Sequence, residues 1–406
     1  MRVLHFVPYY PPERVGGVGH FAAVLHEGLR RRGLESAVVT RGRGPAAPGV
    51  HRIAASRWGW FIGTLRYARA AAACDVVHCQ SGEALPVMLA VRLWPGRRAR
   101  ILATFHVGQR GLVAAERPYL LEGRRFGRGG GAALRARLHG WVDALALRLA
   151  DASNAISRAT ARDLLGPGRG DAMPVLYNPL PPARDSAVAP AEPVELFYAG
   201  IASHRKRVPA LAFVLRAVRE QIPDARLRVA GFRWQDAPEL AALCDEFGLR
   251  DAVECLGVLP PEALPRLHRA ARVLVVPSAY EGLPYVIVEA LREGTPVVAT
   301  RVSGHPEVIE DGVSGRLVPP DDPRALAEAC VELLRDSAAR DRMGEAGRRR
   351  VAERFDAERQ IDAYVDYYRA ISGDPARPLS GDAVRPASGD TARPASGDPV
   401  RDQETS

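Results

Sequence analysis

Several kinds of residue are scarce in this 406-residue chain, and each scarcity argues against a class of function. Aromatic residues make up only 6% of the chain, and its arginines are spread along the whole length. A nucleic-acid-binding protein would more often cluster basic residues with interleaved aromatic side chains. The formal charge of +9 therefore does not predict a nucleic-acid partner. The five cysteines form no Cys-x-x-Cys pair, which argues against a secreted, disulfide-linked protein.

Long apolar runs and metal-binding motifs are missing as well. No segment approaches the ~20 apolar residues that cross a bilayer, and the run 1–7 is too short for a signal peptide. We therefore expect a cytoplasmic protein, either free or peripheral at the inner face of the membrane. The chain has no Asp-x-Asp motif and no histidine or acidic cluster with metal-ligand spacing, so we expect no metal ion and no cofactor.

What the chain does contain is an alternation of short apolar runs with amphipathic helical stretches, the pattern of a parallel sheet wrapped by helices. This predicts two Rossmann-like, doubly wound α/β domains in tandem, facing a cleft. In such sheets ligands bind beyond the carboxyl ends of the strands. The expected strands are 3–7, 37–40, 76–79, 101–105, 152–156 and 174–177, then 194–199, 226–230, 253–256, 273–276, 296–300 and 315–318.

Composition sets the expected boundaries. Residues 1–180 would form the first domain, the proline-rich stretch 181–193 a linker, and residues 194–355 the second domain. Residues 356–371 predict a helix that folds back onto the first domain. Residues 372–406 repeat with a period of eight and contain almost no large apolar side chain, so this octapeptide-repeat tail is predicted to be disordered.

Lysine is nearly absent, since Lys206 is the only lysine among 56 basic residues. It lies in His-Arg-Lys-Arg, shortly after the expected strand 194–199. An ammonium is a compact charge on a flexible stem, whereas guanidinium is a wide planar fork, so a lone lysine suits a phosphate oxygen in a tight space. The alternative is an exposed lysine without a special role.

The strongest motif is PSAYEGLPYVIVEAL, residues 277–291. An apolar strand runs into a turn with Glu281, Gly282 and Leu283, and Pro284 then opens a helix that carries Glu289. A helix N-terminus after a glycine-containing turn offers free amides to an anion. Carboxylates accept hydrogen bonds from neighbouring hydroxyls, so the two glutamates suit a hydroxyl-rich ligand with an anionic end.

This segment resembles the Glu-x7-Glu signature of the retaining glycosyltransferases of family 4, which have the two-Rossmann GT-B fold. Other segments of residues 1–371 are similar to the family in the same order. They are the Gly-Gly loop and helix in 11–40, the histidine-bearing strand ends 75–78 and 104–106, the segments 150–165 and 175–181, and the segment 302–315. The resemblance implies that the first domain binds the acceptor and the second a nucleotide-diphosphate sugar.

The resemblance also implies roles in donor binding. Glu289 would bind the ribose hydroxyls of the nucleotide, and Glu281 the hydroxyls of the transferred sugar. The turn residues Gly282 and Leu283 would also contact the donor. Lys206 would neutralise the diphosphate as charge develops on it during transfer.

In the first domain the resemblance points to one histidine and two glycines. His106 would touch the sugar near the reacting carbon; the alternative is a structural histidine with satisfied hydrogen bonds. Gly16 and Gly17 would let the backbone approach the phosphates, or they form only a tight turn.

One departure from the family pattern concerns the diphosphate. The family has an arginine directly after the glycine that closes the strand, and this chain has Ile201 after Gly200. Either Arg205 or Arg207 supplies the missing charge, or the donor is bound differently.

Residues 107–150 carry eight arginines against three acidic residues. Such a span would meet the headgroups of an anionic membrane, bind a phosphorylated or carboxylated acceptor, or form a solvated loop.

The sequence thus predicts a retaining, metal-independent glycosyltransferase of the hexosyltransferase type. Its partners would be a nucleotide-sugar donor and a sugar, lipid or small-molecule acceptor, such as a polysaccharide, a glycolipid or a metabolite, and no nucleic acid. The alternative is a non-catalytic partner protein that binds a glycan or nucleotide on the same scaffold.

Overall fold

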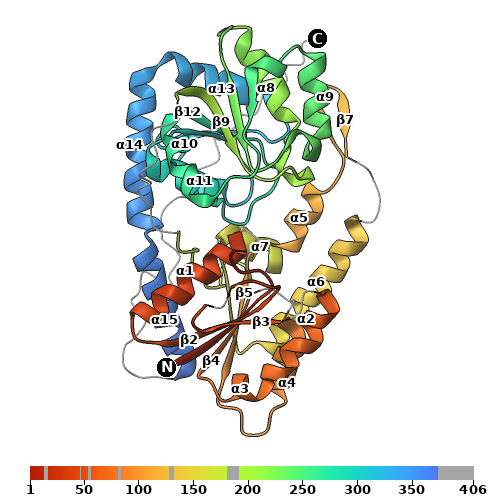
Figure 1. The fold of residues 1–406 in the computed structure, drawn as a ribbon, viewed down its shortest axis with the longest axis vertical. Helices are drawn as coiled ribbons and strands as arrows, with labels where there is room; N and C mark the ends of the chain where they lie inside the picture. Colours follow the sequence, from red (N-terminus) through yellow and green to blue (C-terminus); the bar gives the residue numbers. More distant parts are fainter. Residues whose placement is uncertain are drawn as a thin grey trace, which may run out of the picture.

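The computed structural model describes residues 1–12, 17–45, 47–53, 56–80, 84–127, 132–180 and 192–373. These residues form two domains, each with a six-stranded parallel sheet between layers of helices (Figure 1). The expected α/β fold with two doubly wound domains is confirmed. Gly16, most of the expected linker 181–193 and the tail from residue 374 lie outside the described residues.

The first sheet has the strand order β3-β2-β1-β4-β5-β8. The order reverses between β1 and β4, so their carboxyl ends border the crevice where doubly wound sheets bind ligands. Its strands are β1 (Arg2–Val7), β2 (Glu35–Arg41), β3 (Val50–Ile53), β4 (Val76–Gln80), β5 (Arg100–Phe105) and β8 (Ala152–Ala155).

Two details of this sheet differ from the sequence prediction. Strand β3 was not expected, because its sequence VHRI is only partly buried and contains no apolar run. Residues 174–177 were expected to form a strand, but they contribute only one parallel bridge, from Val175 to Ala155. Both positions lie near an edge of the sheet, where few neighbours impose a clear pattern of burial.

Helices divide between the two faces of the first sheet. On one face α1 (Gly17–Arg31) and α15 (Ala357–Ser372) pack in one core with Val3 and Val76. On the other face Phe6 and Val77 pack against the helices α2 (Arg57–Thr64), α3 (Ala68–Ala72), α4 (Leu85–Arg92) and α6 (Ala132–Leu149).

The second sheet repeats the same topology, in the order β11-β10-β9-β12-β13-β14. Its reversal falls between β9 and β12, which places the segments after these two strands at the crevice. The strands are β9 (Val194–Ala199), β10 (Leu227–Ala230), β11 (Val253–Cys255), β12 (Ala271–Val276), β13 (Val297–Thr300) and β14 (Gly315–Val318).

The helices of the second domain surround this sheet. The larger ones are α8 (Ala210–Arg219), α9 (Pro238–Glu246), α10 (Leu264–Ala270), α11 (Tyr285–Glu293), α13 (Pro323–Arg335) and α14 (Ser337–Arg354). Helix α14 runs along one side of the molecule toward the first domain, and α15 continues beside α1 (Figure 1).

Helix α15 is anchored to the first domain by buried polar contacts as well as by apolar packing. The Tyr368 hydroxyl lies 2.8 Å from Nδ1 of His78, whose Nε2 lies 2.6 Å from Thr104 Oγ1. At the surface Arg32 forms ion pairs with Glu358 and Asp362. The last helix of the chain is therefore part of the core of the first domain.

A second crossing between the domains is made by a short hairpin, β6 (Tyr119–Leu121) and β7 (Arg124–Phe126). Its apolar side chains belong to the core of the second domain, where Phe126 packs edge-to-face on Phe213 of α8. Figure 1 shows β7 beside α9, far from the first sheet. Residues of the expected first domain thus fold onto the second, because they bury apolar side chains there.

Candidate functional site

Lys206 lies at the crevice, in the segment that follows β9. A short 3₁₀ helix, His204–Lys206, ends there because Arg207 adopts a left-handed backbone conformation with φ 52°. The Lys206 side chain is only 11% exposed, and its ammonium forms an ion pair with Glu281. Lys206 is therefore not a stray surface lysine, and its partner is the first glutamate of the signature.

Glu281 follows β12, in the turn before α11, and its carboxylate is held on both oxygens. Oε1 accepts a hydrogen bond from the Ser278 hydroxyl at 3.1 Å, and Oε2 accepts one from Arg205 Nη1 at 2.9 Å. Burial favours the neutral acid, but the charges of Lys206 and Arg205 outweigh it and lower the pKa of Glu281 to about 2. Glu281 is thus a fixed anion between two cations.

The two arginines beside Lys206 point to different places. Arg205 joins the cluster, since its Nη1 also donates to the carbonyl of Tyr280 at 3.0 Å. Arg207 is buried elsewhere, where its Nε donates to Asp321 at 2.9 Å and its guanidinium stacks 3.6 Å from the centre of the Tyr119 ring. Of the two arginines that could replace the family's phosphate-binding residue, the structure thus brings only Arg205 to Glu281.

The second glutamate of the signature, Glu289, lies on α11. It is partly exposed, and it makes no hydrogen bond or ion pair with another described residue. Burial raises the pKa of the Glu289 carboxyl, and neighbouring Arg292 only partly offsets this effect. A carboxylate without a partner among the described residues has its acceptor oxygens available to hydroxyl groups.

The signature turn touches the first domain directly at Gly282. A Cβ atom at Gly282 would collide with the carbonyl oxygen of His106, and one at Gly304 would collide with the carbonyl oxygen of Gly282. Both glycines are therefore required by close backbone approach. The neighbouring Leu283 is buried in the core of the second domain. The turn is held between the two domains.

His106 follows β5 and faces the same crevice. Its ring packs edge-to-face on Phe21 of α1, with ring centres 5.1 Å apart. Its Nε2 is buried without a hydrogen-bond partner, and burial lowers the pKa of His106 to about 3. The Nε2 of His106 is thus not satisfied by a hydrogen bond within the described part of the protein. A neutral ring nitrogen with an unused hydrogen-bonding capacity lies next to the signature turn.

Two further contacts close the crevice between the domains. Gly17, the first residue of α1, lies against the ring of Tyr285 at the start of α11, where an added Cβ would come within 3.3 Å of it. The backbone N–H of Gly108 donates to the Tyr280 hydroxyl at 2.6 Å. Gly17 therefore lies beside the start of α11 in the second domain.

A histidine that the sequence reasoning did not single out also belongs to the cluster. His305 begins α12 (His305–Val308), and its Nδ1 lies 2.6 Å from the carbonyl of Thr300. Its Nε2 is buried and unpartnered, and burial lowers the pKa of His305 to about 4 although nearby Glu281 favours the charged form. The resemblance of segment 302–315 to the family indicated this region, but no sequence pattern identified His305 as a site residue.

Glu307, two residues further, fastens the second domain to the first. Its carboxylate accepts hydrogen bonds from the backbone N–H groups of Arg158 at 3.0 Å and Ala159 at 2.9 Å. These groups open α7 (Arg158–Leu165), and a carboxylate at a helix N-terminus is favoured by the helix dipole. The domains are thus joined by charged and polar contacts on both sides of the crevice.

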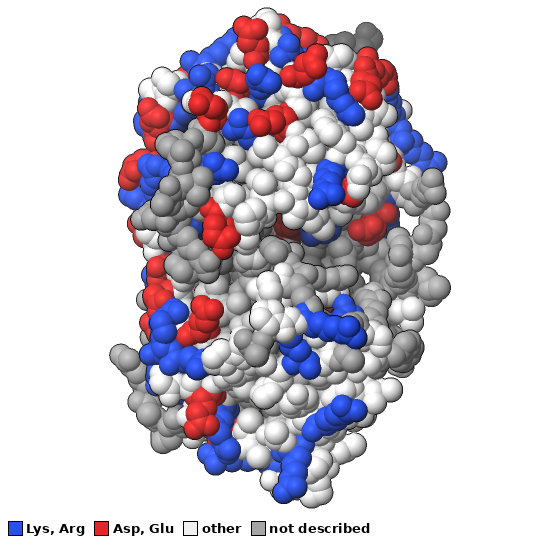
Figure 2. Space-filling model, in the orientation of Figure 1, with Lys and Arg blue, Asp and Glu red and all other residues white. Residues whose placement is uncertain are grey.

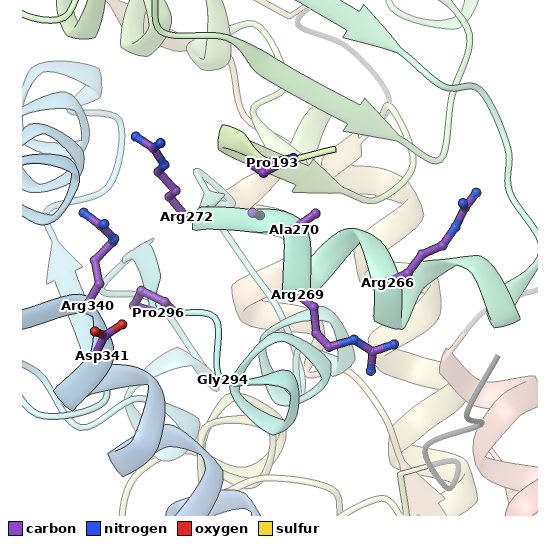
Figure 3. A pocket seen from close by; sticks show the side chains of 10 residues that line it. Pro193, Arg266, Arg269, Ala270, Arg272, Gly294, Pro296, Arg340 and Asp341 are labelled. Carbon is purple, nitrogen blue, oxygen red and sulfur yellow. The ribbon is translucent and has the colours of Figure 1, made fainter. Parts of the chain in front are cut away.

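A pocket of about 570 Å³ lies at the opposite end of the second sheet (Figure 3). It is lined by Arg266, Arg269, Arg272 and Arg340, but their side chains spread apart. Arg269 is paired with Glu293, and Arg340 donates to the carbonyls of Leu333 and Leu334. At least two of the four arginines that line the pocket therefore already have partners within the protein. The pocket lies at the amino ends of β12 and β13, away from Glu281.

The described residues contain neither a metal-binding cluster nor a membrane-spanning helix. No three His, Cys, Asp or Glu side chains come together there as a group that could hold a metal ion. None of the helices in the described ranges is long and apolar enough to cross a membrane.

Comparison with known sequences agrees with the site. A model described as "Glycosyltransferase Family 4" matches residues 15–184, and one described as "Glycosyl transferases group 1" matches residues 182–350. The D-inositol 3-phosphate glycosyltransferase of Corynebacterium urealyticum is 36% identical over 162 residues, which cover 38% of each chain. The alpha-maltose-1-phosphate synthase of Mycobacterium tuberculosis is 29% identical across 91% of this chain and all of that protein.

Solved structures share the fold. A sucrose-phosphate synthase from Thermosynechococcus elongatus superposes with a TM-score of 0.76 at 23% identity, covering 92% of this chain and 100% of that one. HepE of Anabaena, in complex with UDP and glucose, gives a TM-score of 0.71 at 19% identity and covers 91% and 100%. With two family models spanning residues 15–350 and a GT-B arrangement of its domains, the chain belongs to glycosyltransferase family 4.

Proposed function

We propose that the protein transfers a sugar from a nucleotide-diphosphate sugar to a hydroxyl-bearing acceptor, with retention of configuration. The observation that carries this proposal is the cluster in which the Glu281 carboxylate is fixed between Lys206 and Arg205, against the turn that touches His106. The second domain would bind the donor and the first the acceptor. Glu289 on α11, whose carboxylate has no partner in the described part of the chain, would take the ribose hydroxyls.

The charges of the cluster suit a leaving diphosphate. Lys206 and Arg205 together bear two positive charges and Glu281 one negative charge, so one positive charge remains uncompensated within the cluster. Preorganised cations near a leaving group stabilise the charge that develops on it, an effect often worth several kcal/mol. We therefore propose transfer without a metal ion. Activity that survives a chelator such as EDTA supports this, and activity restored only by a divalent cation contradicts it.

The proposed step needs no covalent intermediate with the protein. The bond between the anomeric carbon and the diphosphate oxygen breaks, and the acceptor oxygen bonds to that carbon on the same face. The acceptor's proton passes to the leaving phosphate oxygen. Glu281 would hold the hydroxyls of the transferred sugar, and the neutral Nε2 of His106 would hold another hydroxyl near the reacting carbon.

The acceptor is proposed to carry negative charge. Three similar proteins are named after a phosphate ester. They are D-inositol 3-phosphate glycosyltransferase, alpha-maltose-1-phosphate synthase and sucrose-phosphate synthase. Residues 1–180 of this chain contain 26 basic and 11 acidic residues, a formal charge of +15. Such a domain attracts a phosphorylated or carboxylated acceptor. A panel of charged sugars, lipids and small metabolites separates the acceptor classes.

The experiment is a nucleotide-release assay with a panel of nucleotide sugars and acceptors, on the wild-type chain and on Glu281→Gln. We expect release that depends on the acceptor and falls by about 100-fold in Glu281→Gln, because the sugar loses its anionic partner. The configuration of the product, read by NMR, tests retention.

Glu254→Gln is a matched control, because Glu254 is an exposed glutamate of the same domain paired with Arg228. It should leave turnover unchanged. Tight nucleotide binding without turnover on any acceptor would instead favour the non-catalytic partner protein. Equal activity of wild type and Glu281→Gln would contradict the role given to this carboxylate.

A further inference from the structure

Large apolar side chains are exposed on one side of the first domain. Most of those exposed among the described residues come from α2, α4, α6 and the turns that follow α2 and α4. Trp141 is 80% exposed and Leu93 71%. We call this set the apolar face; its members are Ile62, Leu65, Leu89, Leu93, Trp94, Leu138, Trp141 and Leu145.

The three helices that carry the apolar face cover the same side of the first sheet. Helix α4 contacts α2 on one side and α6 on the other. On α6, Leu138, Trp141 and Leu145 are spaced by three and four residues, so they form one stripe along the helix. The buried side of the helix carries Asp143, opposite the stripe, and Ala146. The stripe therefore points away from the core, and no described element covers it.

Arginine is the charged residue that accompanies this face. Arg66 in the turn after α2, Arg69 on the neighbouring α3 and Arg148 on α6 are exposed, and no ion pair is seen for them among the described residues. The acidic residues described on these helices and in the turns beside them are paired or buried: Asp75 pairs with Arg98, Asp151 pairs with Arg92 and Arg97, and Asp143 is buried. Figure 2 shows blue and white over the lower right of the molecule, the side on which Figure 1 places α2, α4 and α6, whereas red appears at the lower left.

We propose that the apolar face docks the protein onto a membrane surface containing anionic lipids. Exposed Trp and Leu on helices that lie side by side, flanked by arginines, combine the two forces that hold a peripheral protein at a bilayer. The apolar side chains enter the boundary between headgroups and acyl chains, and each arginine gains from the negative surface potential. Trp141 and Trp94 have the amphipathic rings that favour this depth.

Charge favours a bilayer over the other occupants of such a face. A second copy of the chain would bring two domains of formal charge +15 together, and like charges oppose that contact. A nucleic acid would satisfy the arginines but would leave the exposed leucines in water. An anionic bilayer satisfies both groups at once.

The surface differs from the one expected from sequence, which was the whole span 107–150. The structure divides that span. The hairpin β6–β7 folds onto the second domain, where Arg124 pairs with Glu246 and Glu122 with Arg216. Only α6 contributes to the apolar face, together with α2 and α4, which sequence analysis did not implicate.

The test is sedimentation of the full chain with vesicles of phosphatidylcholine alone or mixed with phosphatidylglycerol. We expect the wild type to bind only the mixed vesicles, and to be released by high salt, because the arginines act through a screened potential. Vesicles should also shift Trp fluorescence to shorter wavelength, and Trp141→Phe should reduce that shift while binding persists.

Two variants locate the surface. Leu138→Ser/Trp141→Ser/Leu145→Ser should lower partitioning about tenfold or more, because the stripe can no longer enter the bilayer. Arg66→Gln/Arg69→Gln/Arg148→Gln should weaken binding and its salt dependence without touching the apolar side chains. The control Val258→Ser/Val313→Ser removes two exposed apolar residues of the second domain and should bind like the wild type.

Three outcomes overturn the proposal. The first is absence of wild-type binding to the mixed vesicles at low salt. The second is binding that survives both sets of substitutions on the apolar face. The third is a dimer of the wild type, seen by analytical ultracentrifugation, that the serine variant dissociates while neither binds vesicles. Vesicle binding is measured without substrate, so its failure leaves the proposed transfer reaction untouched, and failure of the transfer assay leaves the membrane inference untouched.

Discussion

The two domains have the same sheet topology but carry different charge and surface apolarity. Residues 1–180 contain 26 basic and 11 acidic residues, whereas residues 194–355 contain 23 and 24. On the second domain many exposed arginines are paired with an acidic residue, as in Arg301–Asp311 and Arg324–Glu328. Figure 2 shows this as mixed red and blue over the upper half and mainly blue over the lower right.

The comparison distinguishes residues that the fold requires from surface residues that contact with a binding partner would explain. In both sheets the central strands are apolar and buried on both faces. Burial of such strands under helices explains why the two sheets share one topology. The second domain has nearly equal numbers of basic and acidic residues, which give it a well-solvated surface. Its distinctive feature is the charged cluster around Glu281. The excess arginine and exposed apolar residues of the first domain have no such structural explanation, and they fit contact with an anionic acceptor and an anionic surface.

Lys206→Ala should have the largest effect, because it removes the only compact cation beside Glu281. We expect transfer to fall by about 100-fold or more with the fold intact, and some loss of unfolding free energy, because Lys206 contributes more than Arg205 to holding the buried Glu281 carboxylate as an anion. Lys206→Arg tests whether a compact ammonium is needed. Nucleotide release and thermal unfolding measure the two quantities, with Arg324→Ala on the same domain as control. Full activity of Lys206→Ala would show that the donor charge is met elsewhere.

Arg207 tests how strongly the domains are coupled through the hairpin. Arg207→Met leaves Asp321 without its partner and removes the stacking on Tyr119, so we expect about 2 kcal/mol of lost stability. Denaturant unfolding measures this loss, and a double-mutant cycle with Tyr119→Leu isolates the stacking contribution. If Arg207→Met instead abolished transfer at unchanged stability, Arg207 would belong to the donor site after all.

The pH dependence of stability reports on Glu281. Its pKa is about 2 in the folded chain against an ordinary 4.5, so the unfolded chain binds the proton more readily. The stabilisation is complete above about pH 4.5 and is lost as pH falls through this range toward pH 2. We expect Glu281→Gln to flatten the fall of unfolding free energy over that window. An unchanged slope would mean that the ion pairs of Glu281 do not form in solution.

The smallest effect is expected from the paired surface of the second domain. Arg324 and Glu328 form an exposed ion pair one helical turn apart, and such pairs contribute about 0.5 kcal/mol or less. Arg324→Gln should therefore leave thermal stability and vesicle binding unchanged. A clear loss of vesicle binding in this variant would show that arginines of the second domain also bind the membrane. It would contradict the proposed difference between the surfaces of the two domains.

Much of the site could be anticipated because it depends on local sequence. Lys206 follows β9 and Glu281 follows β12, and adjacent parallel strands with a reversal of order between them bring their carboxyl ends together. The prediction that Lys206 and Glu281 lie in one site thus needed only the strand pattern and the resemblance. Their roles in catalysis, like that of Glu289, stay predictions.

Other features could not be anticipated. The sequence HRKR does not show that Arg205 turns toward Glu281 while Arg207 turns toward Tyr119. The two side chains diverge because Arg207 itself adopts a left-handed backbone conformation. His305 joins the cluster only because β13 lies beside β12. Likewise the hairpin 119–126 leaves its own domain because Phe213 and its neighbours complete a core that the hairpin alone cannot form.

By itself the sequence determined the two-domain α/β architecture, the position of the signature turn and the excess of positive charge on the first 180 residues. These follow from the order of apolar and polar residues along the chain, which local periodicity records. Only the tertiary structure decided which arginine meets Glu281, which domain receives the hairpin, and which apolar side chains stay exposed on α2, α4 and α6. Those outcomes depend on contacts between residues far apart in sequence, and burial there is decided by packing that no local pattern specifies.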